Sequence, residues 1–270
     1  MKKTKVLGLP YGVWMLIFIV FPIFLMFLYA VRTSSGGFTL DNFRNFFSPM
    51  YMQILWDSVY MAGISTVICL LLGYPVAMII SKMPEKSRNL FLVLIIMPTW
   101  MNFLLRTYSW MNILGKNGLI NKLLTLLGMN TMDLLYNNGA VLLGMVYNFL
   151  PFMIYPIYSV IIKINPSYLE AAKDLGANSV KAFMKVTLPL SVPGIITGIT
   201  MVFMPAVSTF VISDLLGGGT QMYIGNLISH QFLQKGDWNF GSAVSFIMMI
   251  VILIVMMITN KFSKTDKESV

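Results

Sequence analysis

Six long apolar runs divide the chain, and short polar segments separate them. The runs cover approximately residues 8–31, 56–80, 90–114, 140–162, 190–213 and 240–260. Each provides the roughly 20 residues with which a helix crosses about 30 Å of hydrocarbon. Strands of a membrane barrel would alternate in hydrophobicity and would be only about ten residues long. The pattern predicts an all-α polytopic membrane protein with six transmembrane helices, folded as one domain over residues 1–270.

Composition agrees with a membrane location. The chain is 57% hydrophobic and 11% charged, whereas a soluble domain of this size carries about a quarter charged residues. The basic start "MKKTK" resembles that of a signal peptide, but the apolar run behind it is longer than a signal peptide requires, and no A-x-A site follows. We therefore expect the first run to be an uncleaved transmembrane helix.

The basic residues predict the orientation of the spans. With a cytoplasmic N-terminus, thirteen of them fall on the inner side: Lys2, Lys3, Lys5, Lys82, Lys86, Arg88, Lys163, Lys173, Lys181, Lys185, Lys261, Lys264 and Lys267. Five fall on the outer side: Arg32, Arg44, Lys116, Lys122 and Lys235. The positive-inside rule then puts both termini in the cytoplasm. The same topology explains the net charge of +9 without nucleic-acid binding, because the basic residues form no patch with stacking aromatics.

Glycine and proline recur inside the runs: Gly73, Pro75, Pro98, Pro151, Pro156, Pro193, Gly194, Gly198 and Pro205. Lipid tolerates a broken helix only where neighbouring helices or a water-filled cavity satisfy the freed backbone groups. The clustering therefore predicts interrupted spans that pack around a pathway. A simpler interpretation is that both residues are commoner in membrane helices.

The longest polar stretch, "EAAKDLGANSVKAFMKVTLP", lies between the fourth and fifth runs. Asn165 can cap a helix that Gly176 ends, and Asn178 can cap a second short helix that ends at Leu188, where the fifth span begins. One face of the first helix carries Tyr168, Ala171, Ala172 and Leu175 at helical spacing. Such a face predicts a protein partner, unless the helix lies on lipid headgroups.

The spacing within this stretch resembles the EAA motif of ABC importer permeases: EAA, three residues, G, nine residues, I, one residue, LP. Val186 replaces the isoleucine of the motif. The resemblance implies a type I ABC importer permease in which residues 163–189 form a cytoplasmic coupling loop. The coupling residues that it implies are Glu170, Ala171, Ala172, Asp174, Gly176, Leu188 and Pro189.

The resemblance also implies that this loop docks on a separate dimer of ATP-binding subunits. No G-x-x-x-x-G-K-[ST] loop occurs in the chain, so we expect no cofactor in this subunit and expect the partner to use ATP and Mg²⁺.

Three further stretches resemble the spermidine/putrescine importer permeases, and in particular the first of their two paralogous membrane subunits. They are "PTWMNFLLRTYSWM" (98–111), "SDLLGGGTQMYIGNLI" (213–228) and "GDWNFGSA" (236–243). This resemblance implies a second permease subunit, an extracytoplasmic solute-binding protein and the bacterial cytoplasmic membrane. A permease for another small solute, such as an inorganic anion or iron, remains the alternative.

A polyamine is a flexible chain of ammonium groups, so its path should offer aromatic faces and a few carboxylates. The candidates are Trp100, Tyr108 and Trp110 in the third span, with Asp57 and Asp214 at the outer ends of the second and fifth spans. The alternative is an interfacial aromatic belt with solvated helix ends.

Arg106 is the one basic residue within a span, and we expect it to form a structural ion pair, for which Asp214 is the candidate.

Two other classes of protein fit poorly. An ion-coupled secondary transporter usually needs a carboxylate or histidine near the bilayer midplane, but all ten Asp and Glu lie in loops, tails or span ends. A membrane enzyme would need a cluster of catalytic groups, which one Cys and one His do not supply.

Overall fold

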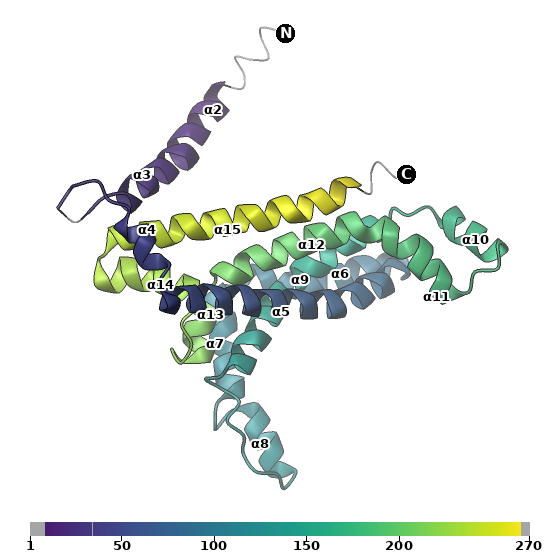
Figure 1. The fold of residues 1–270 in the computed structure, drawn as a ribbon. Coiled ribbons are helices and arrows are strands. Elements are labelled where there is room, and N and C mark those ends of the chain that lie inside the picture. Colours follow the sequence, from purple (N-terminus) through teal and green to yellow (C-terminus); the bar gives the residue numbers. More distant parts are fainter. Residues whose placement is uncertain (1–8, 34, 266–270) are drawn as a thin grey trace.

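The computed structural model describes residues 9–33 and 35–265, and the regular secondary structure of this part is helical apart from one isolated β-bridge between Arg32 and Phe38 (Figure 1). The helices before the coupling loop are α2 (Leu9–Met15), η1 (Leu16–Val20), α3 (Phe21–Ala30), α4 (Asp41–Phe46), α5 (Pro49–Ser81), α6 (Glu85–Trp100), α7 (Phe103–Leu114), α8 (Leu119–Leu126) and α9 (Asn138–Ile161). The later helices are α10 (Pro166–Asp174), α11 (Ser179–Ala182), η2 (Phe183–Thr187), α12 (Leu188–Ser208), α13 (Val211–Gly217), α14 (Ile224–His230), η3 (Gln231–Lys235) and α15 (Trp238–Thr265).

The predicted spans are present. Within the described residues, five helices are long and apolar enough to cross a membrane, and one sharply bent pair makes a sixth. The bent pair is the third span, in which α6 and the segment Phe103–Leu126 meet at 93°. Asn102 lies at the bend and caps α7, because its side chain accepts a hydrogen bond from the Leu104 N–H at 2.8 Å. The third span is therefore not one straight helix.

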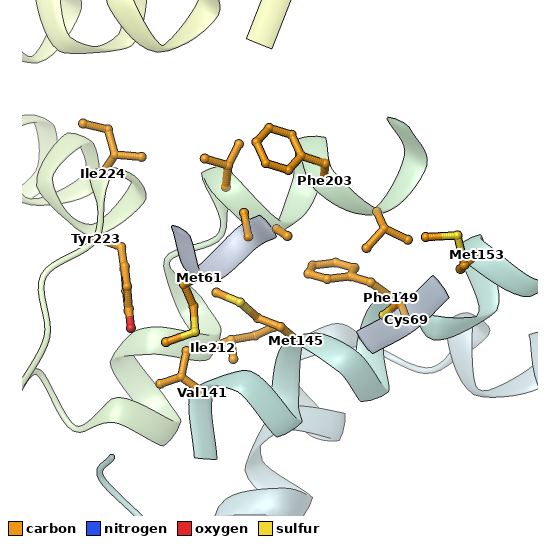
Figure 2. Packing of buried hydrophobic residues seen from close by; sticks show 14 of the residues in the cluster. Met61, Cys69, Val141, Met145, Phe149, Met153, Phe203, Ile212, Tyr223 and Ile224 are labelled. Atoms are coloured by element: carbon orange, nitrogen blue, oxygen red, sulfur yellow. The ribbon is translucent and has the colours of Figure 1, made fainter. Parts of the chain in front are cut away.

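The core lies where α9 packs between α5 and α12. Met145, Phe149 and Met153 of α9 are buried in one cluster with Cys69 of α5 and Phe203 of α12 (Figure 2). In the most apolar stretch of α9, 56% of the residues are buried, compared with 6% for the first span. The α9 helix therefore forms the centre of the bundle.

Glycines bring α12 close to α9. A Cβ atom at Gly194 would lie 2.9 Å from the Pro156 carbonyl oxygen, and one at Gly198 would lie 2.6 Å from the sulfur of Met153. Five prolines lie inside the helices of spans two, four and five without ending them: Pro75, Pro151, Pro156, Pro193 and Pro205. The expectation that Gly and Pro interrupt these spans is wrong, because the glycines serve close helix packing and the helical backbone continues past the prolines.

The fifth span also differs from the prediction. The second helix of the coupling loop does not end at Leu188: α11, η2 and α12 form one continuous helical stretch, Ser179–Ser208, that passes through a π-helical turn. The stretch ends at Ser208, so Asp214 does not follow the span directly but lies on the separate helix α13. The second span starts at Pro49, which places Asp57 within α5 rather than at its end.

The first span, formed by α2, η1 and α3, diverges from the bundle (Figure 1). Its contact with the rest of the chain is through α3, where Phe27 packs on Phe246 of α15 with ring centroids 5.4 Å apart. Lys2, Lys3, Lys5 and Lys267, which belong to the predicted inner set, lie outside the described residues.

Two ends of the bundle can be distinguished. Helices α10 and α11 extend beyond the helices at one end, which we call the loop end, and α4, α13 and α14 lie at the opposite end (Figure 1). The loop end carries Lys82, Lys163, Lys173, Lys181 and Lys185, all from the set predicted to face the cytoplasm.

Candidate coupling loop and transport cavity

The coupling loop, residues 163–189, forms the helix, turn and helix that its sequence predicts. The Asn165 side chain caps α10 by accepting from the Ser167 N–H at 3.1 Å, and the Asn178 side chain caps α11 by accepting from the Lys181 N–H at 2.9 Å. Between the helices, Gly176 adopts a φ of +82° in the left-handed region. The N–H groups of Gly176 and Ala177 then bond the carbonyls of Lys173 and Ala172, at 2.8 and 2.9 Å. This pattern is a Schellman turn, which glycine allows because it has no Cβ.

The outward side of the loop is uncovered. Glu170, Ala171, Asp174 and Gly176 are exposed, and the Leu175 side chain is 90% exposed. Of the remaining motif residues, Pro189 is exposed whereas Ala172 and Leu188 are partly buried. Tyr168, Val180 and Met184 are exposed as well, so the loop leaves several large apolar side chains uncovered.

The inward side of the loop is held against the bundle. The ring of Phe183 in η2 packs edge-on against Tyr74 of α5, with centroids 5.7 Å apart. The Tyr74 hydroxyl also shares a hydrogen bond of 2.8 Å with the hydroxyl of Ser191 in α12. Both contacts tie the base of the loop to α5, so displacement of the loop would be transmitted to the transmembrane helices.

A cavity of about 610 Å³ lies among α7, α9, α12 and the start of α13. Its lining includes four phenylalanines and two methionines, and its polar lining includes Arg106 and Asn148. Arg106 is 7% exposed, and neither its Nε nor its Nη1 has a hydrogen-bond partner. Its guanidinium carbon lies 5.8 Å from the centroid of the Phe103 ring. The sequence identified Arg106, but Asn148, which is 1% exposed, was missed because one amide in an apolar run carries no periodic signal.

None of the five predicted path residues lines this cavity. Trp100 is 76% exposed at the end of α6, and Tyr108 is exposed on α7. Trp110 packs edge-on against Tyr147 of α9, with ring centroids 5.3 Å apart. The three aromatic residues therefore do not form one stacked surface, and their part in a cation path remains a prediction.

The expected ion pair between Arg106 and Asp214 is not formed. The Arg106 guanidinium makes no ion pair with any residue in the described part of the chain. The Asp214 carboxylate instead accepts a short hydrogen bond from the Asn226 side-chain amide. The expectation is wrong because α13 turns Asp214 toward α14.

Asn226 is the centre of a polar network that sequence reasoning missed. Its Oδ1 accepts hydrogen bonds from the Ser213 hydroxyl at 2.7 Å and from the Tyr223 N–H at 3.2 Å. Its amide also donates to the Phe210 carbonyl at 3.2 Å. The network joins α13 to α14 at the end of the bundle opposite the loop, within the stretch 213–228 that the sequence analysis had singled out only for its resemblance.

Asp57 lies beside the same network. Burial, and to a smaller extent the negative charge of Asp57, raises the pKa of Tyr223 to about 12. The Tyr223 hydroxyl is therefore neutral at pH 7, and it donates to the Asn138 side chain at 3.2 Å. Next to Asp57, the Ser58 hydroxyl accepts from the Ile224 N–H at 2.7 Å. No three His, Cys, Asp or Glu side chains of residues 9–33 and 35–265 gather closely enough to bind a metal ion.

The bundle, the protruding loop and the cavity define a membrane transport subunit. Residues 69–264 match the family described as the inner membrane component of binding-protein-dependent transport systems, and the chain belongs to this family. It is thus a permease of an ABC importer and not an enzyme, as the sequence predicted, and it is a multi-pass protein of the cytoplasmic membrane.

Two relatives make the comparison more specific. The chain is 40% identical over 259 residues to the "Spermidine/putrescine transport system permease protein PotB" of Haemophilus influenzae, which covers 93% of this chain and 91% of that protein. It is 39% identical over 259 residues to the protein of the same name in Escherichia coli strain K12, covering 93% and 94%.

Solved structures show the same fold. A bacterial ABC transporter involved in the import of the acidic polysaccharide alginate contains a chain that superimposes with a TM-score of 0.83. That match has 19% sequence identity and covers 97% of this chain and 95% of the other. The MetNI methionine ABC transporter matches with a TM-score of 0.59 and 16% identity, covering 81% and 99%. At these identities the likeness supports the fold alone.

Proposed function

We propose that this chain is a permease subunit of an ATP-driven importer for spermidine and putrescine. The observation that carries the proposal is the similarity, along nearly the whole chain, to permeases named for that activity. Its partners are a dimer of ATP-binding subunits, which uses ATP and Mg²⁺, a second paralogous permease and an extracytoplasmic solute-binding protein. The loop end and both termini face the cytoplasm.

In this function the coupling loop is the contact with the ATP-binding subunits. Glu170, Ala171, Asp174 and Gly176 are accessible for such a contact, and Leu175 supplies an apolar anchor. The unbroken helical backbone from Ser179 to Ser208 supports transmission from the loop to the cavity, because the last residues of α12 line that cavity. Closure of the ATP-binding dimer would thereby change the outer half of the bundle.

Reconstitution tests the proposal. The chain, the second permease and the ATP-binding subunit are placed in proteoliposomes with the binding protein, and uptake of labelled spermidine is measured. We expect uptake to require ATP and to be inhibited by excess putrescine but not by ferric iron or sulfate. Inhibition by iron or sulfate, with none by putrescine, would support a permease for another small solute.

A further inference from the structure

Arg106 is a buried cation with no counter-charge among the described residues. Its side chain is 7% exposed and lines the cavity of about 610 Å³, where Nε and Nη1 have no partner. Asn148 in the same lining donates its amide to the Gly144 carbonyl at 2.8 Å, whereas its Oδ1 has no partner. Unpaired charges are costly inside a membrane, and guanidinium groups there are normally paired. The Arg106 guanidinium therefore requires an anionic partner, and the lining of the cavity contains none.

The described carboxylates of the chain do not supply this group. Asp214, the candidate suggested by the sequence, is exposed and bonded by Asn226. A polyamine cargo would not supply it either, because its ammonium groups repel a guanidinium.

The inner part of the cavity, formed by α9, lies too deep for a lipid phosphate. Asn148 lies ten residues from the start of the 24-residue helix α9, or about 15 Å along its axis, and Phe149 and Phe152 extend the lining deeper. Headgroup phosphates lie outside a hydrocarbon layer of about 30 Å, so they are about 15 Å from its middle. An arginine usually reaches them by extending its side chain to the surface, but the side chain of Arg106 is buried.

We propose that the cavity receives a carboxylate side chain from a transmembrane helix of the second permease subunit, and that this carboxylate pairs with Arg106. The guanidinium presents planar donors that match a carboxylate, and the apolar walls accept the flanking side chains of the incoming helix. The pair positions the two permeases and is formed in the assembled importer. This inference rests on the proposed function in one respect, since it requires a second permease.

Co-purification of the complete importer tests the pairing. We expect Arg106→Gln to reduce the amount of second permease recovered with this chain at least fivefold. Each membrane-embedded Asp and Glu of the second permease is then changed to Asn or Gln. One of these variants should reproduce the loss and, when combined with Arg106→Gln, restore recovery to within twofold of wild type, because both charges are then removed.

Arg44→Gln is the matched control, because Arg44 is exposed at the end of the bundle opposite the coupling loop. We expect this variant to recover as much of the second permease as the wild type does. The substitutions in the second permease leave this chain unchanged, so the test does not depend on the folding of Arg106→Gln. Recovery unaffected by Arg106→Gln, or no acidic residue that couples to it, would overturn the inference. Loss of recovery that is reversed only by added anionic phospholipid would also overturn it, in favour of a lipid. Failure of the proposed function differs from all of these, because the wild-type complex would then take up no polyamine.

Discussion

At the scale of single residues, the network around Asn226 changes the interpretation of Asp214. Asn226 bonds Asp214, Ser213 and the Tyr223 backbone, so the Asp214 carboxylate has a structural partner. The carboxylate is nevertheless exposed, and a passing ammonium group remains a second partner to be tested. The two roles separate if the charge is removed while the acceptor oxygen is kept.

Asp214→Asn removes the charge and retains an oxygen that can accept from Asn226. We expect the thermal stability of the complex to stay unchanged and uptake to fall by up to about fivefold, since an exposed charge pair contributes about 0.2–1 kcal/mol. The decrease should be larger for spermidine, with three ammonium groups, than for putrescine, with two. Asp133→Asn on the exposed Lys116 pair serves as the control and should leave uptake unchanged. Equal uptake by wild type and Asp214→Asn would exclude Asp214 from the path.

At the scale of helices, the sequence predicted which segments are helical and where the coupling loop turns. Hydrophobic runs identify the spans, because a helix in lipid must be apolar over its length. The coupling loop was predictable because Asn165 and Asn178 cap its helices, and Gly176 forms its turn, through contacts with nearby backbone groups. Pro98 predicted an interruption of the third span, but the exact position of the bend at Asn102 and the break after Ser208 were not predicted, because tertiary packing decides which polar or small residue ends a helix. The cavity was not predictable either, since its walls come from three stretches, 103–106, 148–152 and 200–211, that are distant from one another in sequence.

The Schellman turn gives a direct test of coupling. In Gly176→Val a β-branched residue would have to adopt the φ of +82°, at a cost of about 1–2 kcal/mol. We expect co-purification of the ATP-binding subunit and ATP-dependent uptake both to fall, while the amount of chain in the membrane stays the same. Gly128→Val is the control: it carries similar strain at a φ of +75°, also with nothing within 4 Å of an added Cβ. It should keep both the co-purification of the ATP-binding subunit and the ATP-dependent uptake. Full ATPase binding by Gly176→Val would favour a loop that only lies on headgroups.

The close approach of α12 to α9 predicts a stability difference between two identical substitutions. In Gly194→Ala the new methyl group would lie 2.9 Å from a backbone oxygen, so the helices must separate, which typically costs about 1–3 kcal/mol. Gly63→Ala in α5 meets nothing within 4 Å and should leave the stability of the isolated chain unchanged or raise it by up to about 1 kcal/mol, because alanine favours a helix interior over glycine. Thermal unfolding of the detergent-purified chain measures both. A similar melting temperature for the two variants would mean that α9 and α12 separate at little cost.

At the scale of the whole molecule, the two ends of the bundle differ in charge, and this difference carries the proposed orientation. Basic residues of the loop end come from two separate connections in the chain, between α5 and α6 and between α9 and α12, and α10 and α11 extend beyond the helices there (Figure 1). Cytoplasmic loops carry the excess of Lys and Arg.

Cysteines introduced at Lys86 and Lys181, in a chain whose buried Cys69 is replaced by alanine, report the orientation. Both positions are exposed, so only the membrane should protect them. We expect no labelling by an impermeant thiol reagent in intact cells and full labelling after permeabilisation. Lys116→Cys, on the predicted outer side, is the positive control and should react in intact cells. Labelling of either loop-end cysteine in intact cells would contradict this orientation and would indicate the opposite topology.

The uneven burial of the spans has a consequence for biosynthesis. The first span has a mean hydropathy of 2.6 and few internal contacts, so we expect it to pass from the insertion machinery into lipid by itself. The central helix α9 has a mean hydropathy of 1.7, and the residues that pack on it belong to α5, made earlier, and to α12, made later. A nascent chain that ends before Ser208 therefore presents one wall of α9, with Asn148, to acyl chains. Such a chain should be cleared faster by membrane proteases than one that includes α12.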